Sequence, residues 1–164
     1  MIYLGADHGG FKLKEQLEKW FAELKLEFLD VGAAKLDPND DYPQFAFKVA
    51  QLVSAEEINQ VWSKRPKGIL ICRSAAGMVI AANKIKNIRA VAIFDIKMAK
   101  HAREHNDANI IGISADWTSE KEAKEIINTW LTTEFSKAER HTRRIKQIAE
   151  VETDQQCACG NNCC

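Results

Sequence analysis

Short apolar segments alternate with segments of helical spacing along almost the whole chain, and this alternation restricts the fold more than any other feature. Five apolar segments have the length of strands, at residues 2–6, 27–32, 68–72, 89–94 and 108–113. Helical patterns lie between and after them, at about 11–24, 42–54, 76–86, 96–105 and 119–132. Such alternation, with strands apolar on both faces, is typical of a parallel sheet covered by helices on each side. A last helical pattern follows at about 136–150.

The predicted class is a three-layer, doubly wound α/β fold of the Rossmann-like type, with five parallel strands between two layers of helices and an additional C-terminal helix. A chain of 164 residues suits one domain that buries its core without disulfides or metals. We place that domain at 1–150 and a cysteine-rich tail at 151–164, because four of the five cysteines crowd into 157–164. The remaining cysteine, Cys72, stands alone in the body, which agrees with a reducing compartment.

The charges of the chain are balanced. Lysine and arginine together number 23, and so do aspartate and glutamate. We therefore expect neither nucleic acid nor an anionic membrane as a partner, because both are recruited by a field of one sign. No apolar run approaches the roughly 18 residues of a transmembrane helix, and the N-terminus lacks the pattern of a signal peptide. These observations predict a cytoplasmic protein.

Cys72 ends the third predicted strand, and the residues RSAAG then turn the chain into a helix. Ligands of open parallel α/β sheets bind beyond the carboxyl ends of the strands, near the point where strand order reverses. The unpaired amides and the positive dipole end of the following helix favour a thiolate or a substrate oxyanion there. A single strand cysteine is more often a buried, inert apolar residue, and that interpretation stays open.

Two further polar clusters lie near strand ends. The first strand runs into Asp7, His8, Gly9 and Gly10, at the same edge of the sheet as Cys72. Simpler interpretations are a helix cap for Asp7 and a turn for the glycines. The segment 105–107, His-Asn-Asp, precedes the fifth strand and should lie at the opposite edge, from which a partner subunit could bring it to the site.

Several segments together resemble the type B ribose-5-phosphate isomerases and the related galactose-6-phosphate isomerase subunits. The resemblance covers nearly all of residues 1–150. It is carried, in register, by GADHGGFKLK, DYPQFA, GILIC followed by SAAGM, IAANKI, IRAV, REHNDAN and RHTRRI. The fold that it implies agrees with the alternation of strands and helices.

The resemblance implies an aldose–ketose isomerase with Cys72 as the base. Such a reaction needs a base that moves a proton between two neighbouring carbons. It also needs hydrogen-bond donors that stabilise the negative charge of the enediolate. Some relatives use a glutamate at the position of Met78, but a thioether cannot act as a base. By resemblance Ser74 supplies a hydroxyl, and the amides of the turn Arg73, Ser74, Ala75, Ala76 and Gly77 form the anion hole. The alternative for Ser74 is a helix cap, and we expect the turn to lower the pKa of the thiol.

The resemblance also assigns the groups that bind the substrate. His105 assists ring opening with Asn106 beside it. In the family this histidine reaches the site from the partner subunit, which implies a homodimer or homotetramer with the site at the subunit interface. Arg140 and Arg144 share one helix face and, with His8, match phosphate ligands, whereas Asp7 matches a ligand of sugar hydroxyls. A solvated basic face remains the alternative for the arginines.

The chain departs from the family in two places. Arg73 and Ala75 stand where glycine is common, and a positive φ there would cost about 1 kcal/mol or more. An arginine at this position could crowd the sugar, lower the pKa of the thiol or contact a different sugar. The spacer from 54 to 67, with Trp62, is longer than usual and could reshape a surface or subunit contact.

Two metal interpretations compete with this function. HAREH at 101–105 fits the H-x-x-E-H pattern of zinc hydrolases, although five residues are a weak match. The tail CACGNNCC could bind a soft metal, but it lacks the C-x2-C spacing of structural zinc sites, and a disordered, oxidisable tail is an equal alternative. We expect no metal and no cofactor.

We therefore predict a metal-independent isomerase that interconverts ribose 5-phosphate and ribulose 5-phosphate through an enediolate. Two alternatives remain: an isomerase of a six-carbon aldose phosphate, such as allose or galactose 6-phosphate, and a silent sugar-phosphate-binding protein whose anion hole is spoiled by Arg73 and Ala75. The sequence leaves the sugar and the choice between dimer and tetramer open.

Overall fold

The computed structural model describes residues 1–55 and 61–159, with side chains up to residue 152. Five strands form one sheet, in the order β2-β1-β3-β5-β4, and all neighbours are parallel. The strands are β1 Ile2–Ala6, β2 Phe28–Asp30, β3 Lys67–Cys72, β4 Ala90–Ile93 and β5 Ile110–Ser114. The helices are α1 Phe11–Glu23, α2 Tyr42–Ala55, α3 Ala76–Ala82, α4 Ile96–Asn106, α5 Glu120–Thr132 and α6 Glu139–Cys159, with a short 3-10 turn at Trp62–Lys64.

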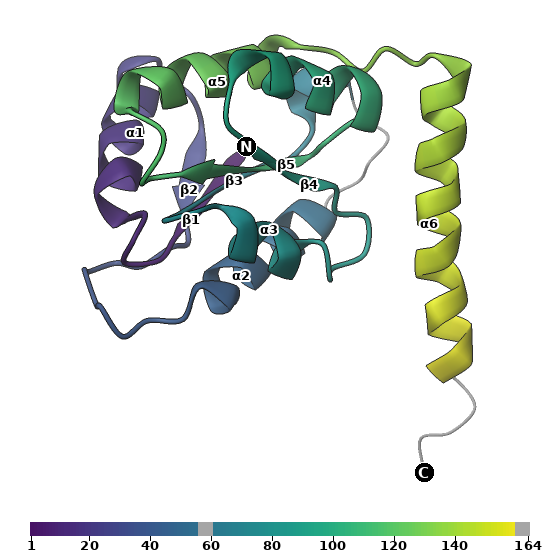
Figure 1. The fold of residues 1–164 in the computed structure, drawn as a ribbon, viewed down its shortest axis with the longest axis horizontal. Helices are drawn as coiled ribbons and strands as arrows, with labels where there is room; N and C mark the ends of the chain where they lie inside the picture. The colour runs from purple at the N-terminus through teal and green to yellow at the C-terminus, as the bar shows by residue number, and fades with distance from the viewer. Residues whose placement is uncertain (56–60, 160–164) are drawn as a thin grey trace.

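The sheet lies between two layers of helices, as predicted. Figure 1 shows α1, α4 and α5 on one face and α2 with α3 on the other, whereas α6 stands beside the body. The order of the strands reverses between β1 and β3, because the chain leaves β1 toward β2 on one side and toward β3 on the other. This makes the fold doubly wound, with its crevice at the carboxyl ends of β1 and β3.

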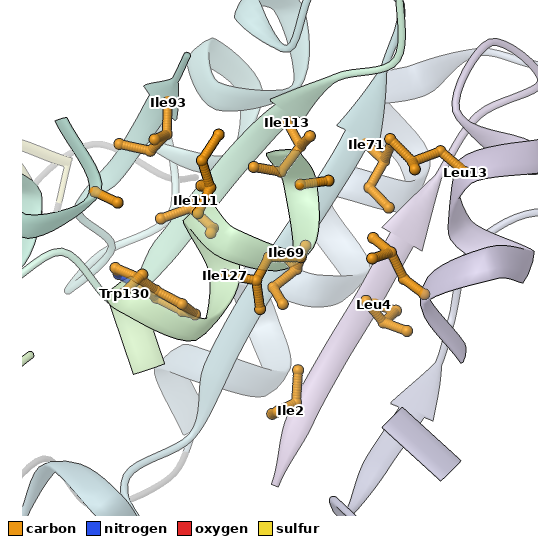
Figure 2. Close-up of a cluster of buried hydrophobic side chains, with 14 of the residues drawn as sticks. Ile2, Leu4, Leu13, Ile69, Ile71, Ile93, Ile111, Ile113, Ile127 and Trp130 are labelled. Atoms are coloured by element: carbon orange, nitrogen blue, oxygen red, sulfur yellow. The ribbon is translucent and has the colours of Figure 1, made fainter. Parts of the chain in front are cut away.

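The core is built by aliphatic side chains that alternate between the two faces of the strands. In Figure 2, Ile69 and Ile71 of β3 lie beside Ile111 and Ile113 of β5, on the face covered by α1, α4 and α5. Leu70 of the same strand faces the opposite layer, with α2 and α3. Full burial of such a side chain contributes roughly 1.5–3 kcal/mol, so both layers are fixed to the sheet by apolar packing.

Some boundaries differ from the prediction. Strand β2 spans only Phe28–Asp30, and α3 ends at Ala82, earlier than its apolar pattern suggests. Helix α6 continues to Cys159, so much of the segment predicted as a tail is helical. The division of the chain into a domain at 1–150 and a tail at 151–164 stays a prediction, and the last cysteines, at 163 and 164, lie outside the described residues.

The spacer between α2 and β3 contributes its tryptophan, Trp62, to the core. This side chain therefore does not reshape the surface of the chain. Trp62 is buried, and its ring meets Trp130 of α5 edge-on at 5.3 Å between centroids. Its indole N–H donates to the carbonyl of Leu131 at 2.9 Å, and the guanidinium of Arg103 lies 3.4 Å from the ring centroid. Residues 56–60 of the spacer lie outside the described residues.

Candidate active site

Cys72 lies in the crevice between β1 and β3, where the sequence places it. It is the last residue of β3 and is only 5% exposed. Its Sγ accepts a hydrogen bond from the amide of Ala75 at 3.1 Å, and the amides of Ser74 and Met78 also favour its ionised form. The turn therefore wraps its backbone donors around the sulfur, as an anion site requires.

The amides of the turn act to lower the pKa of Cys72, as predicted, but the net pKa of the thiol is raised. Burial in the core is the largest cause, and the carboxylate of Asp7 adds to it, whereas the amides of Ser74, Ala75 and Met78 act in the opposite direction. Desolvation of a thiolate outweighs a few dipoles when no full positive charge is close.

The turn after Cys72 has the left-handed conformation that favours glycine. Ala75 has φ 64° and ψ −28°, a conformation that costs an alanine about 1 kcal/mol or more. Ala75 is itself the N-cap residue of α3, and no side chain caps this helix, so the capping alternative for Ser74 does not apply. Gly112 of β5 leaves room for the methyl group of Ala75, because a Cβ on Gly112 would lie only 3.1 Å from the methyl carbon of Ala75.

Arg73 points along the rim of the sheet. Its Nε donates to Oδ2 of Asp116 at 3.0 Å, and the side chain is 71% exposed. A Cβ on Gly9 would lie 2.4 Å from Cγ of Arg73, so the arginine stem lies directly against the turn after β1. Arg73 thus links the turns after β1, β3 and β5.

The turn after β1 carries Asp7 and His8 to the same edge. Gly10 passes so close to β3 that a Cβ there would lie 2.2 Å from the carbonyl oxygen of Ile71, which explains the glycine. The Oδ1 atom of Asp7 accepts the amide of Gly10 at 3.0 Å, so this carboxylate stabilises the turn that leads into α1. The pKa of Asp7 is raised, mainly by burial.

His8 has a partner that the sequence analysis missed. Its Nδ1 lies 2.7 Å from Oδ1 of Asp40, which also accepts the backbone N–H of His8 at 3.1 Å. The pKa of His8 is raised, mainly by this hydrogen bond. In the sequence Asp40 is one of several polar loop residues, and only the folding of 37–41 over the edge of the sheet distinguishes it.

A second group of predicted residues lies on α4 and α6. The ring of His105 meets His141 at 4.3 Å and His101 at 4.6 Å between centroids. A cavity of about 740 Å³ opens beside them, lined by His105, Asn106, Arg140, Arg144 and residues of β4. The pKa of His105 is lowered by partial burial and by the neighbouring histidines.

The two groups are far apart within one chain. His105 precedes β5 whereas Cys72 follows β3, and these strands are parallel neighbours. Five residues of strand span about 17 Å, so the two side chains lie at opposite edges of the sheet. The structure brings together Asp7, His8 and Cys72 with the turn 73–77, and separately His105 and Asn106 with Arg140 and Arg144.

The end of α4 is fixed by an ionic cluster that also escaped sequence analysis. Asp107, in the left-handed region at φ 46°, accepts hydrogen bonds from Arg65, Arg89 and Arg103 at 2.8–3.2 Å. Arg89 also donates to the backbone carbonyl of Asn106 at 3.0 Å. The cluster thereby sets the position of the adjacent histidine and asparagine.

The zinc-hydrolase interpretation of 101–105 finds no support in the geometry. Among the described residues, the one group of three whose possible ligand atoms approach within 4.8 Å of one another is Asp7, His8 and Asp40. The rings of His101 and His105 meet edge-on instead of converging.

Within the described part of the chain, no helix is both long enough and apolar enough to cross a membrane.

Known proteins resemble this chain in both sequence and fold. The family model described as Ribose/Galactose Isomerase matches residues 2–148. The chain belongs to this isomerase family. Ribose-5-phosphate isomerase B of Mycobacterium tuberculosis is 38% identical over 151 residues, which cover 92% of this chain and 89% of that protein.

Solved structures agree with this assignment. Ribose-5-phosphate isomerase B of Mycoplasma genitalium, determined with bound ribulose-5-phosphate, matches this isomerase with a TM-score of 0.84 and 34% identity, covering 93% of this chain and 95% of that one. The enzyme of Clostridium thermocellum gives a TM-score of 0.84 at 36% identity, covering 94% and 98%. The predicted family, fold class and enzyme class are confirmed. The roles of the individual side chains stay predictions.

Proposed function

We propose that this isomerase interconverts ribose 5-phosphate and ribulose 5-phosphate through an enediolate, with Cys72 as the base. The observation that carries the proposal is the position of the thiol, which ends β3 in the crevice with a backbone amide 3.1 Å from its sulfur. Relatives that are 34–38% identical bear the name ribose-5-phosphate isomerase B, and one is described with ribulose-5-phosphate bound.

The chemistry follows from what surrounds the sulfur. The thiolate takes the proton from C2 of the open-chain aldose and returns it to C1, while the hydroxyl proton of O2 passes to O1, so no other reactant is needed. The negative charge that develops on the enediolate oxygens is stabilised by the amides of residues 73–77 and by the hydroxyl of Ser74. Asp7, buried beside the thiol, accepts hydrogen bonds from sugar hydroxyls.

A second copy of the chain completes this site. Arg140, Arg144 and His105, the residues predicted to bind the phosphate and open the ring, line one cavity. This cavity lies at the opposite edge of the sheet from Cys72, so one chain alone does not assemble the predicted site. Helix α6 stands beside the body and exposes Ile148 and Val151, as expected of a helix that packs on another subunit. In the resulting homodimer or homotetramer, His105 opens the sugar ring, Asn106 lies beside it, and both arginines bind the phosphate together with His8.

Isomerases of six-carbon aldose phosphates remain the alternative within the family, because the name of the family includes galactose. Arg73 is the observation that favours this alternative, since its exposed guanidinium stands at the rim where relatives commonly have glycine. Activity on allose or galactose 6-phosphate exceeding that on ribose 5-phosphate would select it. A cytoplasmic location remains part of the proposal.

The function is tested by proton exchange. The purified protein is incubated with ribose 5-phosphate in D2O with a chelator, and deuterium at C2 is followed by NMR. We expect exchange by the native protein and by Cys163→Ala, which removes a thiol near the C-terminus of the sequence, but none by Cys72→Ala. Binding without exchange by the native protein would instead identify a silent sugar-phosphate-binding protein.

A further inference from the structure

Asp40 is bound to one residue through two hydrogen bonds. Its Oδ1 lies 2.7 Å from Nδ1 of His8 and also accepts the backbone N–H of the same residue at 3.1 Å. The backbone contact fixes where His8 lies, and the ring contact fixes how the imidazole is turned. With Nδ1 engaged, Nε2 is the nitrogen that can meet a ligand, and the ring is about one third exposed.

The charge of Asp40 has few other partners. Its side chain is 7% exposed, and among the described residues its second oxygen, Oδ2, is buried without a hydrogen-bond partner. A carboxylate removed from water is costly unless a positive charge in contact compensates it. His8 is in contact, so a neutral imidazole would leave this carboxylate uncompensated, whereas an imidazolium pairs with it.

The loop that carries Asp40 is held in place by its own hydrogen bonds. The amide of Asp40 donates to the carbonyl of Asp37 at 3.1 Å, and the side chain of Asp37 accepts the amide of Asn39 at 3.0 Å. This turn precedes α2 and brings a residue 32 positions away in sequence onto the end of β1. The pair is thus a tertiary contact between two structured turns.

We propose that Asp40 is a positioning residue that holds His8 as an imidazolium with Nε2–H available to the substrate phosphate. The inference rests on the proposed function, in which His8 contacts that phosphate. Three charged groups face His8: Asp7 after β1, Asp40 before α2 and Arg73 after β3. The hydrogen bond to Asp40 is the largest cause of the raised pKa of His8. Asp7 acts in the same direction, while partial burial and Arg73 oppose it.

The benefit to the enzyme is a phosphate site that works above neutral pH. A phosphate monoester is largely a dianion above its second pKa of about 6. A histidine with the ordinary pKa of about 6.5 is only roughly one tenth protonated at pH 7.5, so it would be mostly uncharged when the dianion is present. The carboxylate of Asp40 removes this mismatch by keeping the imidazole charged over a wider range of pH.

The test is the titration of His8 in the full-length protein, followed by NMR of its ring, in the native protein and in Asp40→Asn. Asparagine keeps the shape and an acceptor for the backbone N–H but removes the charge. We expect the pKa of His8 to fall toward its ordinary value in this variant. The dissociation constant for inorganic phosphate should rise several-fold at pH 7.5 and stay nearly unchanged at pH 5.5.

Two variants serve as controls. Asp37→Asn removes a charge from the same loop without touching His8, so the titration should stay as in the native protein. Asp40→Glu keeps the charge and should retain part of the elevation. The proposal is overturned if Asp40→Asn leaves the titration unchanged, or if phosphate binding weakens equally at both pH values, which a merely structural role would produce. Isomerase turnover by the native protein is measured separately, and its absence would contradict the proposed function and not the pairing of these two side chains.

Discussion

Replacing Asp107 with alanine offers a quantitative check on how the structure holds His105 and Asn106. The carboxylate of Asp107 bridges three guanidinium groups, and one of them, that of Arg103, is fully buried. Removing one partner of a buried ion pair costs about 3–5 kcal/mol, because the remaining charge stays buried without compensation. Arg103 keeps its bond to the carbonyl of Ala108, which places the expected loss near the lower end of that range.

The loss is measured by urea unfolding and by the melting temperature. At about 2–4 °C per kcal/mol for a chain of this size, a loss of about 3 kcal/mol should lower the melting temperature by roughly 6–12 °C. Asp116→Ala is the matched control, because it breaks the exposed ion pair with Arg73 and should cost less than about 1 kcal/mol. A loss for Asp107→Ala as small as that of the control would refute the view that this cluster is a buried, charge-compensated unit.

Three further predictions concern single residues. Cys72 should be alkylated by iodoacetamide more slowly than a free cysteine in solution at pH 7.5, because burial raises its pKa. The rate should climb as the pH increases. Peptide mapping by mass spectrometry checks this, and labelling at neutral pH as fast as that of free cysteine would contradict it. Ala75→Gly should change the free energy of unfolding by less than about 1 kcal/mol, since relief of the left-handed backbone and loss of a buried methyl group oppose each other. Ala75→Val should cost about 2 kcal/mol or more, and equal melting temperatures for the two variants would refute the assigned conformation. Trp62→Ala should lower the stability by about 3–5 kcal/mol in urea unfolding, and a loss below 1 kcal/mol would show that the ring is not part of the core.

The fold could be predicted from the sequence because its signals are local. Five apolar segments of strand length alternate with helical patterns, and each of the five appears in the sheet. The position of Cys72 also followed from general rules, since it ends the strand at which the order reverses. The boundary of α6 was missed because its polar continuation carries no apolar pattern that would distinguish a helix from a tail.

The electrostatics of the site could not be predicted in the same way. The amides that lower the pKa of the thiol are close to it in sequence. Its burial and the proximity of Asp7, in contrast, depend on the packing of β1 against β3, and these two effects reverse the sign of the pKa shift. Asp40 and the arginines around Asp107 act through contacts between residues that are distant in sequence. A linear pattern shows such residues only as polar positions in loops and helix ends.

The central claim, that the active site is completed by a second copy of the chain, is tested most directly by mixing two inactive variants. In a mixed dimer of Cys72→Ala and His105→Ala, one site carries both lesions and the other carries neither. After the subunits are exchanged at equal concentrations, random pairing should restore about a quarter of the native rate of ribose 5-phosphate isomerisation. Each variant alone should stay inactive. A mixture that remains inactive after verified exchange would contradict the claim, since it would show that Cys72 and His105 of the same chain act in one active site.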